Sequence, residues 1–179
     1  LLDGSGGIDF AGPVLLRGDP AEVLLFQTAG NSGDDILFRS SITNLESLSL
    51  TNRESLRLDT GTAGDVTVQG TVGDLGAGDL TFVAANDATF ESAVTADTFT
   101  QLAGQGTTTF EAAFDLAGTF SFTGTSLTLE GSGNDAEGAM TVTNSGTFTT
   151  GNSADLTVAG ALTQDGTGPV VLGEDLILD

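Results

Sequence analysis

The sequence predicts an all-β fold, a parallel β-helix (β-solenoid) with essentially no α-helix. Short apolar–polar–apolar runs recur along the chain, and Gly or small polar residues separate them. No stretch keeps the apolar period of 3.6 residues that an amphipathic helix needs. Gly-x-Gly turns recur along the chain, as expected if one small unit is stacked many times.

The predicted strands are short. Between residues 99 and 129 they fall at 109–110, 114–116, 120–122 and 127–129. The pattern Asp, apolar, Thr, apolar occurs at 65–68, 79–82 and 155–158, with close variants at 126–129 and 139–142. Two apolar side chains on one face with Thr on the other are typical of a half-buried strand. Nearer the N-terminus we expect strands at 8–10, 14–16, 23–26, 36–38 and 45–50, the last with Leu48 and Leu50 inward.

The repeat unit is inferred from the Gly-x-Gly turns, which begin at Gly4, Gly76, Gly104, Gly131 and Gly166. The last four starts are separated by 28, 27 and 35 residues. A helix-free unit of about 22–30 residues predicts one coil of a β-solenoid. The chain would then hold roughly seven coils, stacked ~4.8 Å apart. We expect residues 1–179 to form one solenoid segment and, since the chain begins at Leu1 rather than Met, to be part of a longer repeat protein.

The physical reason for stacking is that one coil cannot bury its own apolar side chains. We expect a continuous apolar column built from Phe82, Phe90, Phe110, Phe120, Phe122, Leu127 and Leu129. Each such side chain contributes about 1.5–3 kcal/mol on burial. A β-sandwich is the competing fold, but it favours longer strands and usually a buried Trp or Tyr, and this chain contains neither residue.

Composition excludes several classes of function. The chain has 4 Arg, no Lys, His or Cys, and 25 acidic residues, which gives a net charge of -21. Binding to nucleic acid requires many cations, so we predict no nucleic-acid partner. Without Cys there is neither a disulfide nor thiolate chemistry. No apolar run approaches the roughly 18 residues of a membrane span, so we predict no membrane insertion. Arg53, Glu54, Arg57 and Asp59 are expected to pair on a solvated face.

Longer strings carry a resemblance to a known family. Residues 99–107 (FTQLAGQGT) parallel residues 162–169 (LTQDGTGP), with a looser copy at 26–30. Together with SLTLEGSGNDAEGAMTV and SGTFTTGNSADLTVAGAL, these strings resemble the repeats of bacterial filamentous-haemagglutinin and autotransporter-passenger proteins, which are large surface adhesins. The resemblance is clearest over residues 95–179. It implies a right-handed parallel β-helix at the cell exterior, serving as a stalk, fibre or adhesive surface, and it implies no catalytic residues.

Paired carboxylates are the catalytic chemistry that remains without His or Lys. Glycosidases need two acids about 5–10 Å apart, and the best candidates are Asp87 with Glu91, or Asp34 with Asp35. Nothing distinguishes these residues from the other acids, so we predict no enzymatic activity and no catalytic or cofactor-binding residues. A carbohydrate-active β-helix enzyme remains the alternative.

Two further short motifs resemble ligand-binding sequences. Residues 131–135 (GSGND) resemble half of a calcium-binding repeat, but such repeats hold the ion between successive copies, and one copy favours an ordinary turn. We therefore predict no metal site, and a calcium-dependent adhesin is the second alternative. The tripeptide Arg17-Gly18-Asp19 matches an integrin-recognition sequence, yet its residues are also typical of turns.

The sequence thus predicts a non-enzymatic structural or adhesive element of a bacterial fibre or stalk, secreted or displayed on the cell surface. Expected partners are further coils or other copies that join end to end through the open solenoid edges. A host or surface glycan, or a protein ligand, is the further expected partner.

Overall fold

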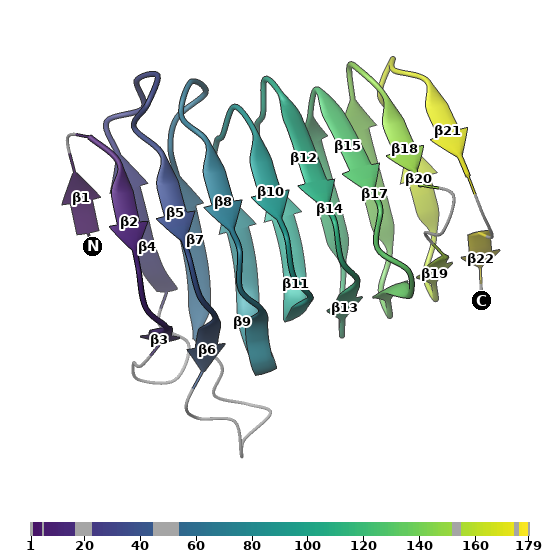
Figure 1. Cartoon of the computed structure of the whole chain (residues 1–179). Helices are drawn as coiled ribbons and strands as arrows, with labels where there is room; N and C mark the ends of the chain where they lie inside the picture. The colour runs from purple at the N-terminus through teal and green to yellow at the C-terminus, as the bar shows by residue number, and fades with distance from the viewer. Residues whose placement is uncertain are drawn as a thin grey trace.

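The structure, a computed structural model, describes residues 2–4, 6–16, 23–44, 54–151, 155–173 and 176–178. All the regular secondary structure in these ranges is β-strand, and the strands pair in parallel. They lie side by side from one end of the molecule to the other (Figure 1). The prediction of an all-β parallel solenoid without α-helix is confirmed for these residues. The predicted strand at 45–50 lies outside the described ranges.

One sheet has eight strands, and it is called face 1 below. Its order is the order of the chain, with one strand from each coil. The strands are β2 (Ile8–Phe10), β5 (Ile36–Phe38), β8 (Val66–Val68), β10 (Ala88–Phe90), β12 (Thr107–Phe110), β15 (Ser126–Leu129), β18 (Phe148–Thr150) and β21 (Val170–Leu172).

The other sheet has fourteen strands arranged as two ladders. The ladder called face 2 contains β3 (Val14–Leu16), β6 (Ile42–Asn44), β9 (Val72–Phe82), β11 (Val94–Gln101), β13 (Phe114–Leu116), β16 (Asn134–Ala136), β19 (Leu156–Val158) and β22 (Leu176–Leu178). The ladder called face 3 contains β1 (Leu2–Gly4), β4 (Val23–Thr28), β7 (Ser55–Asp59), β14 (Phe120–Gly124), β17 (Met140–Asn144) and β20 (Leu162–Gln164), together with β9 and β11. Because β9 and β11 run through the corner between the ladders, they join both into one sheet.

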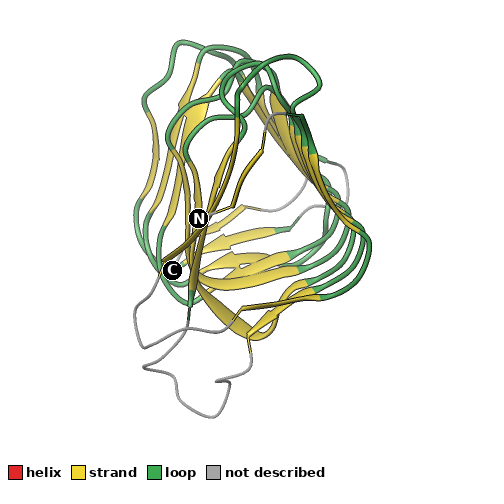
Figure 2. Ribbon diagram, turned by 90° about the vertical axis from the view of Figure 1, so that its left-hand side faces the viewer, coloured by secondary structure: helices red, strands yellow, loops and turns green. Residues whose placement is uncertain are grey.

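Viewed along its axis, the solenoid has three strand-lined faces around one interior (Figure 2). Each coil runs from face 1 to face 2 to face 3 and then returns to face 1, as β10, the two halves of β11 and then β12 show. Backbone bonds join one coil to the next at the corners as well, for example from Glu111 N to Phe90 O at 2.9 Å. Short strands therefore suffice, since each pairs with the coils above and below it.

Coil length varies along the chain. In face 1, Ile36 pairs with Val66, a step of 30 residues, whereas Thr108 pairs with Leu127, a step of 19. The predicted range of 22–30 is therefore wrong at its lower end. Residues 54–151, which are described without a gap, complete about five coils, against the roughly seven predicted for the whole chain. Face 1 continues on both sides of this segment to reach eight strands.

The Gly-x-Gly turns misjudge coil length because they lie at different corners. The turn at Gly104 lies between face 3 and face 1, and the turn at Gly131 lies between face 1 and face 2. Gly76 and Gly78 fall inside β9. The intervals of 27 and 28 residues therefore mix different parts of the coil. The matched strings at 99–101 and 162–164 do occupy equivalent positions, three coils apart in face 3. The looser copy at 26–30 is out of register with them, because Phe26 belongs to the column of Phe82 and not to that of Phe99.

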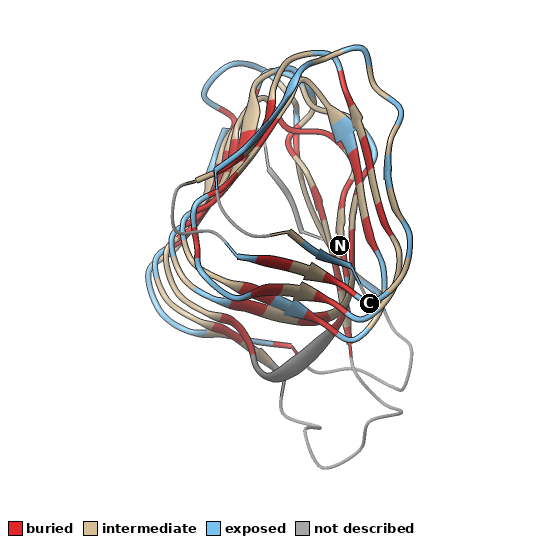
Figure 3. Cartoon of the chain, turned by 90° about the vertical axis from the view of Figure 1, so that its right-hand side faces the viewer, coloured by how far each residue is buried: buried red, intermediate tan, exposed pale blue. Residues whose placement is uncertain are grey.

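The core is continuous along the axis, and buried positions alternate with outward ones on the strands (Figure 3). All seven apolar residues predicted to be buried have at most 1% of their surface exposed. They do not form a single column, because they reach the interior from different faces. Phe90 stacks on Phe110 with ring centroids 4.6 Å apart in face 1, and Phe99 stacks on Phe120 at 4.9 Å in face 3. The two stacks touch through Phe99 and Phe110, at 5.2 Å.

The four charged residues Arg53, Glu54, Arg57 and Asp59 were predicted to pair on a solvated face. Arg53 lies outside the described residues, and a solvated position is wrong for Glu54. Its exposed fraction is 1%, while Arg57 points outward from β7 and is half-buried. An ion pair forms between neighbouring coils of face 1, where Arg39 Nη2 lies 2.8 Å from Asp9 Oδ2. The hydrogen bond from Arg39 lowers the pKa of Asp9, and the same contact raises the pKa of Arg39.

Candidate functional site

The first candidate acid pair, Asp87 and Glu91, is held apart by the backbone. These residues flank the three-residue strand β10, and four steps of extended chain separate their Cα atoms by about 13 Å. The Asp87 carboxylate accepts a 2.6 Å hydrogen bond from the N–H of Thr107, whereas Glu91 accepts one from Gln69 at 3.3 Å. The two carboxylates therefore bond in opposite directions along the axis, Asp87 to the following coil and Glu91 to the preceding one, and neither contact pairs them with each other.

Asp34 and Asp35 are adjacent in sequence but face different surroundings. Asp34 is 8% exposed and accepts hydrogen bonds from the N–H of Gly6, at 3.0 Å, and from the backbone and side chain of Asn31. The pKa of Asp34 is lowered first by the hydrogen bond from the Asn31 side chain, then by that from the Asn31 N–H and last by that from the Gly6 N–H. Burial acts in the opposite direction and raises this pKa. Asp34 thus ties two coils together.

Asp35 begins a ladder of side-chain hydrogen bonds at the entrance to face 1. Its carboxylate accepts the N–H of Asp65 at 2.9 Å, and the carboxylate of Asp65 accepts the N–H of Asp87 at 3.0 Å. Asp87 continues the series to Thr107. Each Asp that precedes a face 1 strand therefore caps the equivalent backbone position of the next coil. This arrangement explains Asp65 of the Asp–apolar–Thr–apolar pattern as a stacking device, whereas Asp79 lies inside β9 and Asp155 precedes β19 of face 2.

The calcium-like motif is also used inside the fold. Asn134 is 1% exposed, and its side-chain amide donates to Gly131 O and, at 3.3 Å, to Asp155 O. Its amide oxygen accepts the N–H of Phe114. The neighbouring Asp135 pairs in register with Asp115 on face 2. Asn134 is therefore committed to backbone groups of its own turn and of both adjoining coils.

The remaining motif, Arg17-Gly18-Asp19, lies outside the described residues. Within the described ranges, no group of three or more acidic side chains is arranged to hold a metal ion. The same ranges contain no helix with the length and apolar character needed to cross a membrane.

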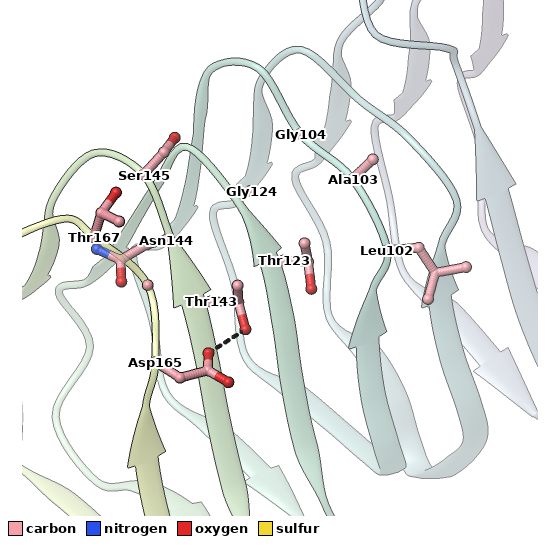
Figure 4. A pocket seen from close by; sticks show the side chains of 11 residues that line it. Leu102, Ala103, Gly104, Thr123, Gly124, Thr143, Asn144, Ser145, Asp165 and Thr167 are labelled. Atoms are coloured by element: carbon pink, nitrogen blue, oxygen red, sulfur yellow. Dashed lines mark hydrogen bonds between the residues drawn. The ribbon is translucent and has the colours of Figure 1, made fainter.

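A groove along the corner between faces 3 and 1 is the site that the sequence analysis missed. It has a volume of about 440 Å³ and crosses four successive coils. It is lined by Leu102, Ala103, Gly104, Thr123, Gly124, Thr143, Asn144, Ser145, Asp165, Gly166 and Thr167. Figure 4 shows the side chains of Leu102, Thr123, Thr143 and Asp165 on neighbouring segments of the ribbon.

Register explains why these side chains form a row. Thr123 pairs with Thr143 between β14 and β17. Leu102 and Asp165 each directly follow a residue that pairs into the same ladder, Gln101 and Gln164. One side chain per coil therefore lines the groove at equivalent positions. The Thr143 hydroxyl donates to Asp165 Oδ1 at 2.6 Å, which orients this carboxylate across two coils.

The inner wall of the corner is fixed by buried amides. Gln101 and Asn144 are each 1% exposed; Thr108 donates to Gln101 Oε1 at 2.7 Å, and Gln164 donates to Asn144 Oδ1 at 2.6 Å. Asn144 in turn donates to Gly146 O at 2.6 Å. Because buried amides are costly unless their hydrogen bonds are satisfied, these bonds hold the corner in one shape. The groove floor is therefore preformed.

The chemistry of the groove is that of a binding surface. Its lining offers hydroxyl groups, backbone, small apolar groups and the exposed side chain of Leu102, and Asp165 is the one ionisable residue among the lining residues. The sequence contained a signal for it, the match between 99–104 and 162–167. Recognising the groove also required knowing that Thr123 and Thr143 fill the two coils between.

Comparisons of this chain with protein families, with curated proteins and with solved structures find no match. The fold and the geometry therefore define the class, which is a parallel β-solenoid built from short repeated coils.

Proposed function

We propose that this protein is a structural or adhesive element of a bacterial fibre or stalk, secreted or displayed on the cell surface, with no enzymatic activity. The observation that carries this proposal is the uniform ladder of face 1, in which eight successive strands pair in parallel. A fold of this kind lengthens by adding coils, and it presents long side faces without changing its core. The resemblance of residues 95–179 to filamentous-haemagglutinin and autotransporter-passenger repeats supports the same role.

The edge strand at the end of the solenoid indicates which partners such an element would bind. β21 pairs with β18 on one side, and among the described residues no strand pairs with its other edge. An unpaired parallel edge is a template for another strand. Further coils, or a second copy joined end to end, are the proposed partners at this edge.

Labelling of intact cells tests the location. Antibodies raised against the chain are expected to label producing cells without permeabilisation. Labelling that appears only after the cells are permeabilised would contradict the proposal.

Self-association is tested with Leu172→Lys, which places a charge on the inward side of the edge strand β21. Sedimentation velocity over a range of concentrations is expected to show weaker association of Leu172→Lys than of the unaltered chain. Glu130→Lys changes an exposed residue beside β15 on a side face and serves as the control. Equal effects of the two substitutions would contradict association through the edge.

A further inference from the structure

We propose that the corner groove binds an unbranched, neutral glycan laid along the solenoid axis. The proposal deepens the adhesive function above and rests on it, since it names the ligand class that an adhesive side surface would take. The groove has the volume typical of ligand sites, and its hydrogen-bonding groups come from successive coils.

The spacing of the lining groups favours a polymer with a short repeat. Equivalent side chains recur once per coil, so Thr123 and Thr143 lie one strand spacing apart, ~4.8 Å. A β-linked hexose chain repeats at close to this distance, and each sugar ring would meet one coil. An extended peptide repeats its side chains on one face every ~6.7 Å, which does not match the coils.

The groups in the groove suit sugars. The hydroxyl groups of a sugar both donate and accept hydrogen bonds. The hydroxyl groups of Thr123, Ser145 and Thr167 at the groove surface can do the same. The oriented carboxylate of Asp165 accepts from sugar hydroxyls. Leu102, with 51% of its surface exposed, offers an aliphatic surface to the C–H face of a ring at the other end of the row.

Charge narrows the ligand to neutral glycans. The chain carries a net charge of -21, and the ionisable residue of the groove is an acid, Asp165. A polyanionic glycan would be repelled both by the local carboxylate and by the field of the whole chain. The four coils that line the groove cover about 14 Å along the axis, enough for three to four sugar units.

Calorimetric titration of the full chain with neutral β-glucan oligosaccharides of two to eight units tests the proposal. Affinity is expected to rise with length up to about four units and then to level off, and polygalacturonate is expected not to bind. Absence of binding by every neutral oligosaccharide, or preferential binding of the polyanion, would overturn the proposal.

A blocking variant locates the site. Thr123→Arg places a long side chain across the groove and is expected to weaken glucan binding at least tenfold, while Thr123→Ser retains it. Thr157→Arg changes an outward residue of β19 on face 2, which is the face opposite this corner, and is expected to change affinity less than twofold. Equal affinity of Thr123→Arg and the unaltered chain would overturn the site.

A second variant covers the case in which Thr123→Arg fails to fold, as judged by circular dichroism. Leu102→Asp changes an exposed residue at the end of the groove, and it is expected to weaken binding at least fivefold. Unchanged affinity in this variant would equally overturn the site. Surface labelling of cells remains informative on its own, because a chain that labels intact cells but binds no glucan refutes the groove proposal and leaves the fibre role in place.

Discussion

Two coils of the same solenoid, one in the middle and one near the C-terminus, bury similar residues very differently. Leu129 and Leu172 belong to one inward column of face 1, connected through Thr150. Leu129 is fully buried, whereas Leu172 is 46% exposed. In the next inward column, Phe148 is 1% exposed and its partner Val170 is 42% exposed.

The difference teaches where the stability of this fold resides. The register places equivalent residues of both strands on the inward side, so an inward position alone does not bury a side chain. Leu129 has a neighbouring coil on each side, β12 and β18, whereas β21 has β18 on one side only among the described residues. A solenoid coil is stabilised chiefly by contacts with its neighbours.

The largest expected effect compares Leu129→Ala with Leu172→Ala. The first leaves a cavity between two coils and is expected to lower the free energy of unfolding by about 2–5 kcal/mol. The second removes a side chain that is already half in solvent and is expected to cost less than about 1 kcal/mol. Urea denaturation followed by circular dichroism measures both. Equal losses would show that coverage by neighbouring coils is not the deciding factor.

Two glycines with a positive φ test how much the close approach of neighbouring coils contributes to stability. Gly61 has a φ of +63°, and a Cβ there would lie 2.7 Å from Gly30 Cα in the neighbouring coil. Gly133 has a φ of +78° with open space around the Cβ position. Gly133→Ala is expected to cost about 1–2 kcal/mol from the left-handed conformation alone. Gly61→Ala is expected to cost more than Gly133→Ala, because the coils must also separate. Thermal denaturation of both variants gives the comparison, and the reverse order would refute it.

Two substitutions compare an aspartate of the face 1 ladder, which hydrogen-bonds to the next coil, with an aspartate that is exposed to solvent. Asp65→Ala removes the acceptor of the Asp87 N–H and the nearer of the two acceptors of the Asn86 amide, and it is expected to cost about 1–3 kcal/mol. Asp115→Ala removes a like charge in register with Asp135, and it is expected to be neutral or slightly stabilising, by less than about 0.5 kcal/mol. Urea denaturation at neutral pH measures both, and a destabilised Asp115→Ala would contradict the assignment.

The smallest expected effect on the free energy of unfolding is its dependence on pH through Asp34. Its pKa in the folded state lies below the ordinary value of 3.8, so it contributes stability above that value, and this contribution is lost as pH falls through the folded pKa. The stability difference between the unaltered chain and Asp34→Asn is therefore expected to hold from neutral pH down to about pH 5 and to shrink in more acidic solution. Urea denaturation at a series of pH values measures it. A difference that persists unchanged into strong acid would contradict the role of the carboxylate.

The sequence predicted individual strands better than their spacing. The runs at 114–116, 120–122 and 127–129 are β13, β14 and β15 in the structure, because alternation over three residues is a local property. The period was misjudged because Gly-rich turns are permitted at every corner. Glu54 was misplaced because its burial depends on neighbouring coils. Likewise, the groove depends on the register between coils, which brings together Leu102, Thr123, Thr143 and Asp165.

By itself, the sequence determined the class of fold, the inward positions of the apolar residues and the strongly acidic surface. These follow from alternation and composition, which act within one coil. Only the tertiary structure decided which inward residues are covered, which aspartates cap the next coil and where a groove opens. These features arise from the stacking of coils, and stacking is set by contacts between residues about 20 positions or more apart.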